Sequence, residues 1–344
     1  MKKIYILLDN NKYFSNHIRF SEINYKIIID YFRDKNIEVE PIPINKVAFS
    51  EAIGNSIIFT ISSEKPYHKQ YIDDTIEILN INNNNELIPS KNILKCHENK
   101  GYQEYYKNIV GIDSLNGYYF NADTYDNNFL KSKYKFPLVL KSIDGSGSRG
   151  VNLVHNENEL LSKINSFKVS THIRFLIYLR ESIYKFLKLK RFNIEKLKYY
   201  KDHQNFVVQE FVPNLSYDYK VLIFFDKYYV LKRNINKGDF RASGSGNFEY
   251  VEVEDSLLTY SKEIFKKFNE PFMSFDICFD GKNYYLIEYQ GIHFGEYTQR
   301  NSSGYYYESE GVWQFKEEKK SIEFDLAYSL YNHILKNNLI KELI

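Results

Sequence analysis

The chain has 344 residues, of which 26% are charged and 43% hydrophobic, and a formal net charge of +2. This length allows two domains with a full core, and a charge so near zero gives no global electrostatic case for binding nucleic acid. Its two cysteines, Cys96 and Cys278, cannot build a disulfide framework or a zinc site. The first apolar run is too short for a signal peptide, and no run reaches about 18 uncharged apolar residues. We therefore expect a cytoplasmic protein without a membrane span.

The first 93 residues alternate between strand and helix patterns. The predicted strand, helix, strand, strand and helix are Ile4–Leu8, Glu22–Phe32, Ile37–Ile42, Ser56–Ile61 and Gln70–Leu79. Strands that alternate with helices predict a parallel sheet. We expect an N-terminal α/β domain over residues 1–93 and α+β structure over residues 94–344.

In the middle of the chain, predicted elements flank a glycine-rich loop. They are a helix over Leu94–Asn108, strands over Phe136–Lys141, Val151–Val154 and Phe206–Val212, and a helix over Glu157–Ile164. The loop, Gly145-Ser146-Gly147-Ser148-Arg149-Gly150, matches the dinucleotide pattern G-x-G-x-x-G. A strand rather than a helix follows it, which disfavours dinucleotide binding. A strand–loop–strand arrangement is typical of a flap whose backbone N–H groups cover phosphates, and the plain alternative is a hairpin turn.

Protein kinases also use a glycine-rich flap, but this chain lacks their His-Arg-Asp and Asp-Phe-Gly signatures. After the flap, His172–Tyr200 is a long basic and apolar stretch that we interpret as an insertion. Its apolar residues at helical spacing are Ile173, Leu176, Ile177, Ile183, Tyr184 and Leu187. A basic amphipathic helix here could contact an anionic membrane surface or an acidic partner, or its apolar face could pack on the subdomain while its lysines face water.

The last part of the chain is predicted to be strands closed by helices. The predicted elements are a hairpin of Val221–Phe225 and Tyr228–Lys232, a helix over Asp255–Phe268, paired strands Phe275–Phe279 and Tyr284–Tyr289, and a helix over Ile322–Leu335.

Six segments, taken together and in order, resemble the ATP-grasp superfamily, in particular its glutamate-ligase and glutathione-synthetase branch. The segments are Phe136–Lys141 with the loop after it, Val207–Val212, Tyr217–Val221, Lys232–Ser243, Ser274–Ile277 and Leu286–Gln290. The resemblance covers about residues 95–295 and implies a Rossmann-like pre-ATP-grasp domain over 1–93. It further implies an ATP-grasp domain over 94–344, divided into a B subdomain over 137–213 and a C-terminal subdomain over 214–344.

The chain departs from the pattern of that branch at a few positions. Lys220 stands where the branch often has arginine, and Ser243 and Gln290 stand where it has asparagine. Gly291–Gly295 replaces the usual Ser-Pro-Gly. The nucleotide half of the pattern is thus kept, whereas the acceptor half is specialised.

The resemblance implies that ATP binds in a cleft between the two subdomains. The residues expected to bind its phosphates are Lys100, Lys141, Gly145, Ser146, Gly147, Ser148 and Gly150. Gln209, Glu210, Phe211 and Val212 are expected to form the hinge that reads the adenine, and Asp218 is expected to meet the ribose. A lysine offers a phosphate a compact positive charge, although Lys100 could also be an ordinary solvated lysine on a helix.

The same resemblance implies two Mg²⁺ ions, with Mn²⁺ able to substitute, held by Asp276, Glu288 and Gln290. Mg²⁺ takes oxygen ligands from a few carboxylates and from substrate phosphates. Glu288 and Gln290 are two apart on a predicted strand, so both point to one face. The alternative is that these are polar residues on the wet face of a hairpin.

The expected catalytic residues are Arg233, Arg241, Lys220 and His293. A planar guanidinium suits a transferring phosphoryl group or a substrate carboxylate, and His293 follows the metal strand and could contact the acceptor. Surface ion pairs for the arginines and a structural histidine are the alternatives.

We expect an ATP-dependent carboxylate–amine ligase that forms an acyl phosphate, which an amine then attacks to leave an amide, ADP and phosphate. The partners would be a small-molecule, glycan or peptide carboxylate and an amine. The sequence leaves two alternatives open: a small-molecule kinase with a stable phosphorylated product, and a nucleotide-binding module without catalysis.

Overall fold

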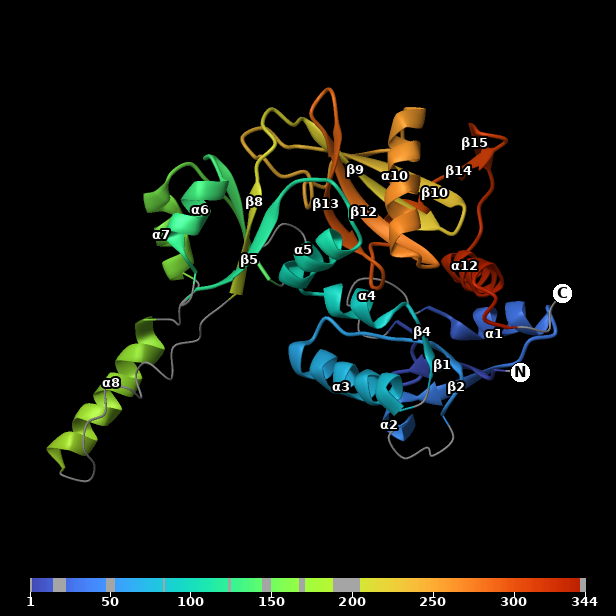
Figure 1. Ribbon diagram of the computed structural model, residues 1–344, viewed down its shortest axis with the longest axis horizontal. Coiled ribbons are helices and arrows are strands. Elements are labelled where there is room, and N and C mark those ends of the chain that lie inside the picture. Colours follow the sequence, from blue (N-terminus) through green and yellow to red (C-terminus); the bar gives the residue numbers. More distant parts are fainter. Residues whose placement is uncertain are drawn as a thin grey trace. The chain divides into compact units, whose positions relative to one another are not determined.

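The computed structural model describes residues 2–14, 23–47, 53–82, 84–122, 125–143, 150–166, 171–187 and 205–340. The chain divides into two compact units. The smaller unit is Asn116–Phe211, and the larger unit joins Met1–Leu115 to Val212–Ile344 (Figure 1). The two units meet at residues 115/116 and 211/212 rather than at 93/94. The domain boundary at 93/94 stays a prediction.

A four-stranded parallel sheet lies at the start of the larger unit. Its strands, in the order β2-β1-β3-β4, are β1 (Ile4–Leu8), β2 (Val39–Pro43), β3 (Ile57–Phe59) and β4 (Glu86–Ile88). The helices between them are α1 (Tyr25–Arg33), α2 (Ile44–Val47) and α3 (Pro66–Asn82). The parallel sheet predicted from the alternating pattern is confirmed.

A helix predicted over Leu94–Asn108 is wrong in one respect, since two helices cover this segment. They are α4 (Lys91–Cys96) and α5 (Lys100–Ile109). Glu98 takes a left-handed backbone conformation, with φ of 51°. The side chain of Asn99 then caps the start of α5 by accepting a hydrogen bond from the Tyr102 N–H. The chain turns at this point, and Lys100 becomes the first residue of the second helix.

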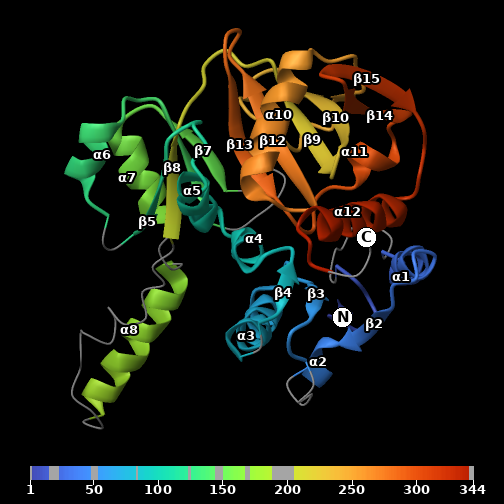
Figure 2. The ribbon, with the colours of Figure 1, turned by 45° about the vertical axis from the view of Figure 1, so that its right-hand side comes forward.

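A seven-stranded sheet forms the other half of the larger unit. It runs β13-β12-β9-β10-β14-β15, with β11 also paired to β10. The strands are β9 (Tyr217–Phe224), β10 (Lys227–Asn234), β11 (Phe248–Glu249), β12 (Phe272–Phe279), β13 (Tyr284–Gln290), β14 (Gly304–Ser309) and β15 (Val312–Glu317). The helices are α10 (Asp255–Phe268), α11 (Tyr297–Arg300) and α12 (Ile322–Lys336). Figure 2 shows α10 lying along this sheet.

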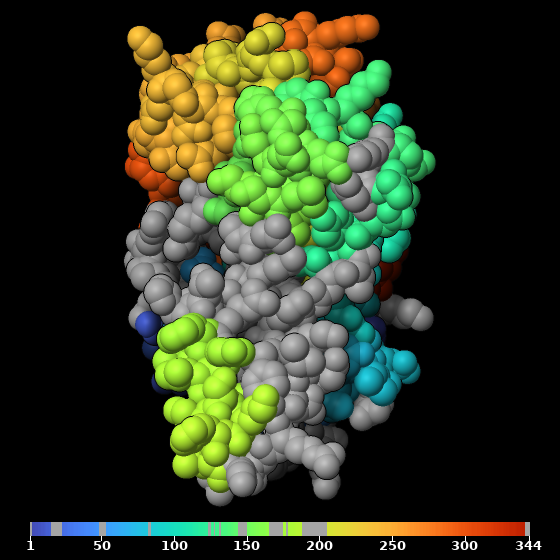
Figure 3. Space-filling model, turned by 90° about the vertical axis from the view of Figure 1, so that its left-hand side faces the viewer, coloured from blue at the N-terminus to red at the C-terminus, as the bar shows by residue number. Residues whose placement is uncertain are grey.

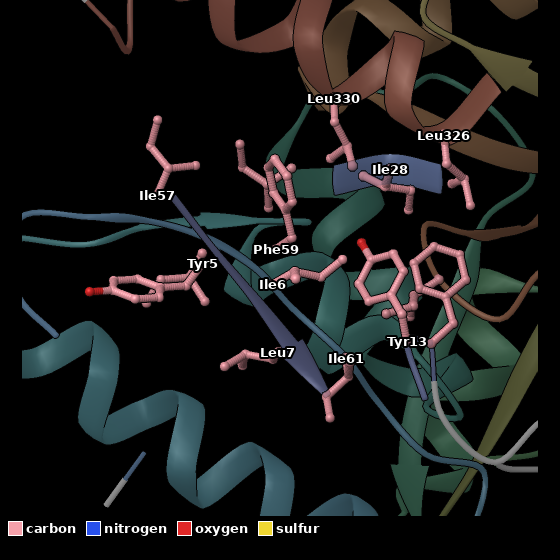
Figure 4. Packing of buried hydrophobic residues seen from close by; sticks show 14 of the residues in the cluster. Tyr5, Ile6, Leu7, Tyr13, Ile28, Ile57, Phe59, Ile61, Leu326 and Leu330 are labelled. Atoms are coloured by element: carbon pink, nitrogen blue, oxygen red, sulfur yellow. The ribbon is translucent and has the colours of Figure 1, made fainter. Parts of the chain in front are cut away.

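Alternation along the strands gives this sheet two different faces. One face packs Val221, Ile223 and Val230 against Leu257 and Phe265 of α10. The other face carries residues of a second core, which the sheet shares with β1, β3 and α12; they are Leu222, Phe224, Tyr229 and Phe272. Figure 4 shows Leu326 and Leu330 of α12 close to Ile28 of α1 in this second core.

The smaller unit is built on a four-stranded antiparallel sheet in the order β5-β8-β6-β7. Its strands are β5 (Gly117–Asn121), β6 (Leu138–Ser142), β7 (Val151–Val154) and β8 (Asn205–Glu210). Its helices are α6 (Asn127–Lys133), α7 (Glu157–Ser166) and α8 (Thr171–Phe186). Because β5 pairs with β8, this sheet begins well before residue 137, the predicted start of the B subdomain.

Among the described residues, no helix is both long and apolar enough to cross a bilayer.

Candidate active site

Most of the expected charged site residues on the strands of the larger unit lie on one face of the seven-stranded sheet. Asp218 and Lys220 are two apart on β9, so their side chains share a face. Asp218 pairs directly with Arg233 on β10, and Lys220 pairs with Asp276 on β12. Directly opposite residues of antiparallel strands point the same way. The strand registers therefore gather four charged side chains on one face of the sheet, and the far end of that face packs into the apolar core.

Arg233 is the centre of this charged cluster and is only 5% exposed. Its Nε donates to Asp218 Oδ1 at 2.6 Å and its Nη2 to Asp218 Oδ2 at 2.7 Å. The same Nη2 lies 2.9 Å from Asp276 Oδ2, while Lys220 Nζ lies 3.3 Å from Asp276 Oδ1. Two acids and two bases thus balance in charge, and the planar guanidinium fixes the position of both carboxylates.

The two carboxylates respond to this environment in opposite ways. Burial alone would raise the pKa of Asp276, but Arg233 and Lys220 hold it down at about 2. Burial raises the pKa of Asp218 despite its contact with Arg233, and the nearby charge of Asp276 adds to that rise. Two acids that share one arginine cannot both be favoured equally in the ionised form. The environment therefore favours the ionised form of Asp276 more strongly than that of Asp218.

The polar residues of β13 join the cluster from the next strand. Glu288 pairs with Asp276, and Gln290 pairs with Ser274. Gln290 Nε2 lies 3.5 Å from Glu288 Oε1, so the two side chains are neighbours. Lys100, at the start of α5, brings its Nζ to 4.0 Å from Glu288 Oε1. The break between α4 and α5 thus places an expected phosphate ligand beside an expected metal ligand.

This arrangement fits a Mg²⁺ site in which the protein supplies only a few of the ligands. No group of three His, Cys, Asp or Glu side chains that could hold a metal ion by itself occurs in the described ranges. Mg²⁺, however, is usually bound through one or two carboxylates together with substrate phosphates. Asp276 and Glu288 supply two carboxylates, and Gln290 supplies an amide oxygen beside them. The donor set is chemically suitable for Mg²⁺ when phosphates complete it.

Ser274 is a polar group of this face that sequence reasoning missed. It is 1% exposed, and its Oγ finds no hydrogen-bond partner within the described residues. The signal was present in the sequence, since Ser274 precedes Asp276 by two positions on a strand and so shares its face.

Arg241 lies in the exposed loop between β10 and β11. Its Nε and Nη2 each lie 2.9 Å from the carboxylate oxygens of Asp239. These hydrogen bonds hold the pKa of Asp239 at about 2. The predicted role of Arg241 at the transferring phosphoryl group stays a prediction, as does that of Arg233.

His293 is buried and contacts the end of the N-terminal sheet. Its Nε2 lies 3.1 Å from the carbonyl oxygen of Ser62, which can only accept, so Nε2 donates. Its ring stacks on that of His97, with centroids 4.9 Å apart. No motif or spacing in the sequence singles out His97. These contacts favour a linking role for His293, and the predicted contact with the acceptor stays a prediction.

The expected nucleotide residues of the smaller unit share a sheet of their own. Lys141 on β6 lies opposite Val207, and Gln209 on β8 lies opposite Val139, so both side chains point to one face. The other face packs Leu140 and Val208 against α6 and α7. Lys141 and Gln209 are buried all the same, at 5% and 2% exposure. Both polar side chains are thus buried on the face of the sheet that is opposite to the apolar core of this unit.

The hinge residues differ in their surroundings. The Glu210 carboxylate accepts hydrogen bonds from the backbone N–H and the side-chain amide of Asn116, each at 3.0 Å. Phe211 is partly exposed, and Val212 is buried with Leu115 and Cys278. Of the predicted flap, Gly145, Ser146, Gly147 and Ser148 lie outside the described residues. Gly150 is described, with φ of 72°, and its carbonyl oxygen accepts a hydrogen bond from the Ser142 N–H.

A scan against models of protein families finds no match, and neither does a search of curated protein sequences. Solved structures do match. The chain is similar to D-cycloserine synthetase DcsG, with a TM-score of 0.54 and 9% identity over 96% of this chain and 99% of that chain. It is also similar to the macrocyclase MdnC from Microcystis aeruginosa MRC, bound with the precursor peptide MdnA, with a TM-score of 0.50 and 9% identity over 96% of this chain and 100% of that chain. At such low identity these likenesses establish the fold, and the chain has the mixed α/β fold of the ATP-grasp ligases.

Proposed function

We propose that the protein is an ATP- and Mg²⁺-dependent carboxylate–amine ligase that works through an acyl phosphate. The observation that carries this proposal is the charged face of the seven-stranded sheet. There Asp276, Glu288 and Gln290 stand side by side on β12 and β13, next to Lys220 and Arg233. A set of oxygen donors beside fixed cations is suited to a metal-bound triphosphate.

Asp276, Glu288 and Gln290 would hold Mg²⁺, which when bound draws negative charge from the phosphate oxygens. The chain's own cations act around it. Lys100 neutralises phosphate charge from beside Glu288, and Lys141 is the second phosphate ligand that the resemblance implies. Arg233 and Lys220 keep Asp276 ionised and oriented, because both hold its carboxylate oxygens. Arg241 would stabilise the charge of the acyl phosphate.

In the proposed reaction a carboxylate oxygen of the substrate attacks the γ-phosphorus of ATP, and ADP leaves. The amine then attacks the acyl carbon, the C–O bond to phosphate breaks, and an amide and phosphate are released. The protein positions the two substrates and stabilises charge, and it needs no covalent bond to either.

The substrates that we propose are a small-molecule or peptide carboxylate and an amine. Two similar structures support this range. DcsG is named for the synthesis of D-cycloserine, a small molecule, whereas MdnC is a macrocyclase bound with a precursor peptide. The departures at Gly291–Gly295 concern the region expected to contact the acceptor, so the amine is the less predictable of the two substrates.

A coupled assay of ADP and phosphate release tests the proposal with panels of amino acids and short peptides. A ligase releases both products only when a carboxylate and an amine are present together. A stable phosphorylated product formed from one substrate would show a kinase instead. No turnover with any pair, together with binding of an ATP analogue that is lost in Lys141→Ala, would show a nucleotide-binding module.

A further inference from the structure

Helix α8 of the smaller unit carries a stripe of exposed apolar side chains. In a helix of 3.6 residues per turn, Phe175, Leu179 and Phe186 fall along one line, and Leu176, Ile183 and Leu187 widen it on one side. All six side chains are exposed, with Phe186 at 86% and Phe175 at 61%. Figure 3 shows the atoms of α8, in yellow-green, at the molecular surface.

This stripe corrects the helical face predicted from the sequence. Leu176, Ile183 and Leu187 belong to it as expected, but Tyr184 is half-buried on another side of the helix. The side chains of Ile173 and Ile177 lie outside those described. The described apolar side chains of this face are exposed to solvent and so are not packed on the subdomain that carries the helix.

Positive charge dominates the rest of the helix. The helix contains Arg174, Arg180 and Lys185 against a single acid, Glu181. Glu181 is buried and accepts a hydrogen bond from Arg180 Nη2 at 3.1 Å, so its negative charge is turned away from solvent. Arg180 and Lys185 are exposed. An apolar stripe bordered by exposed cations suits a partner that is apolar beneath an anionic surface.

The length of the helix indicates how such a partner would be bound. Its 16 residues span about 24 Å, which is less than the roughly 30 Å hydrocarbon core of a bilayer. The charged side chains within that length also oppose burial across the bilayer. The helix is instead suited to lie flat, with its apolar stripe at the boundary between headgroups and acyl chains.

We propose that α8 docks the protein on the surface of an anionic phospholipid membrane. Phe175, Leu179 and Phe186 enter the interface, and Arg180 and Lys185 face the anionic headgroups. The attraction has an electrostatic part, which salt weakens, and an apolar part, which salt does not weaken. This docking is independent of the proposed reaction, since it depends on no residue of the charged face.

Charge also decides against a second copy of the chain on the same stripe. Two antiparallel copies of α8 would bring together helices of equal, positive net charge, and like charges across an interface oppose association. A membrane with acidic headgroups supplies the complementary sign. A dimer held by α8 is therefore the main competing outcome of the test.

Sedimentation of the full chain with vesicles tests the proposal. We expect binding to phosphatidylcholine vesicles that contain phosphatidylserine and little binding to phosphatidylcholine alone. Raising the salt from about 0.1 M to about 0.5 M should lower the bound fraction several-fold, because the Debye length shortens. The double variant Phe175→Ser with Phe186→Ser should weaken binding by at least about tenfold, and Lys185→Glu should weaken it less and reduce its dependence on salt.

Matched controls come from other exposed positions. Tyr67 and Ile81 of α3 are as exposed as the two phenylalanines, so Tyr67→Ser with Ile81→Ser should leave vesicle binding unchanged. Lys282→Glu in an exposed turn controls for the loss of positive charge. Circular dichroism of each variant checks that the fold is kept. The proposal is overturned by absence of binding to anionic vesicles at low salt, by equal binding to neutral vesicles, or by light scattering that shows a dimer lost in the phenylalanine variant.

Discussion

At the scale of single residues, the site depends on one arginine shared by two carboxylates. The resemblance assigns separate tasks to Asp218, Arg233 and Asp276, namely ribose, phosphoryl group and metal. The structure pairs them with each other, because the β9–β10 and β9–β12 registers bring them opposite or diagonal to one another. Sequence motifs can identify such residues, but only the strand registers show which of them are in contact.

Replacing Arg233 should destabilise the larger unit. Arg233→Ala leaves Asp218 and Asp276 buried or half-buried without their shared cation, and we expect a loss of about 3–5 kcal/mol in the free energy of unfolding. Arg241→Ala is the control, because its ion pair with Asp239 lies in a loop with about a third of each side chain exposed, and it should cost less than about 1 kcal/mol. Urea unfolding measures both. Equal effects of the two variants would show that Arg233 is not the centre of the cluster.

Replacing Glu288 tests the metal assignment. Glu288→Gln removes a carboxylate where phosphates concentrate negative charge, and we expect kcat to fall by roughly 100-fold or more across a Mg²⁺ titration. Gln290→Asn should keep part of the activity, since asparagine is usual in the branch that the chain resembles. A full rate in Glu288→Gln at every Mg²⁺ concentration would place the metal elsewhere.

At the scale of elements, apolar periodicity located the well-buried segments. Strand β1 and helix α10 have the bounds predicted from the sequence, and α12 ends one residue later than predicted. The sequence did not indicate β5, whose partner β8 lies far along the chain, nor the hairpin β14–β15, whose strands mix aromatic with polar and charged residues. Long-range pairing and solvent-facing strands leave a weak periodic signal, so these elements could not be found locally.

The end of the predicted flap packs closely on Ser142, and only a glycine at position 150 leaves room for this contact. A Cβ at Gly150 would lie 2.8 Å from the Ser142 Cβ, and the backbone there has φ of 72°. Gly150→Ala should therefore destabilise the smaller unit by about 1–3 kcal/mol more than Gly111→Ala destabilises the larger one. Gly111 is a matched control, because it has the same φ of 72° and a Cβ added there would meet nothing within 4 Å. Equal effects in urea unfolding would mean that Ser142 does not crowd Gly150.

At the scale of the whole molecule, a buried acid links the two sheets of the larger unit. Glu270, just before β12, accepts hydrogen bonds from the Ser90 N–H at 3.1 and 3.2 Å, although the two residues are 180 positions apart. Burial raises the pKa of Glu270 to about 8, even though its contacts with Ser90 act in the opposite direction. The acid is therefore neutral in the folded protein at pH 7.

This raised pKa predicts how stability depends on pH. The unfolded chain releases the Glu270 proton near pH 4.5, whereas the folded protein keeps it up to about pH 8. The protonated Glu270 therefore makes its full contribution to the free energy of unfolding below pH 4.5. That contribution is lost as the pH rises from 4.5 to about 8. Glu270→Gln should remove this pH dependence, which amounts to about 5 kcal/mol between the two pKa values, and urea unfolding between pH 5 and pH 8.5 measures most of it.

Comparing the two proteins at each pH isolates this acid from other groups. Burial lowers the pKa of His333 to about 4, so His333 lowers stability as pH falls below 6.5 in the wild type and the variant alike. If the difference between the two proteins does not change with pH, Glu270 does not have a raised pKa.

Transfer of oxygen from substrate to phosphate tests the proposed ligase reaction most directly. The carboxylate that supports ADP release in the substrate panel is labelled with ¹⁸O in both oxygens, and the released phosphate is examined by mass spectrometry. An acyl phosphate predicts one ¹⁸O atom in each phosphate, because the C–O bond breaks when the amine attacks. Phosphate without label, or label retained in a stable phosphorylated product, would contradict the proposed reaction.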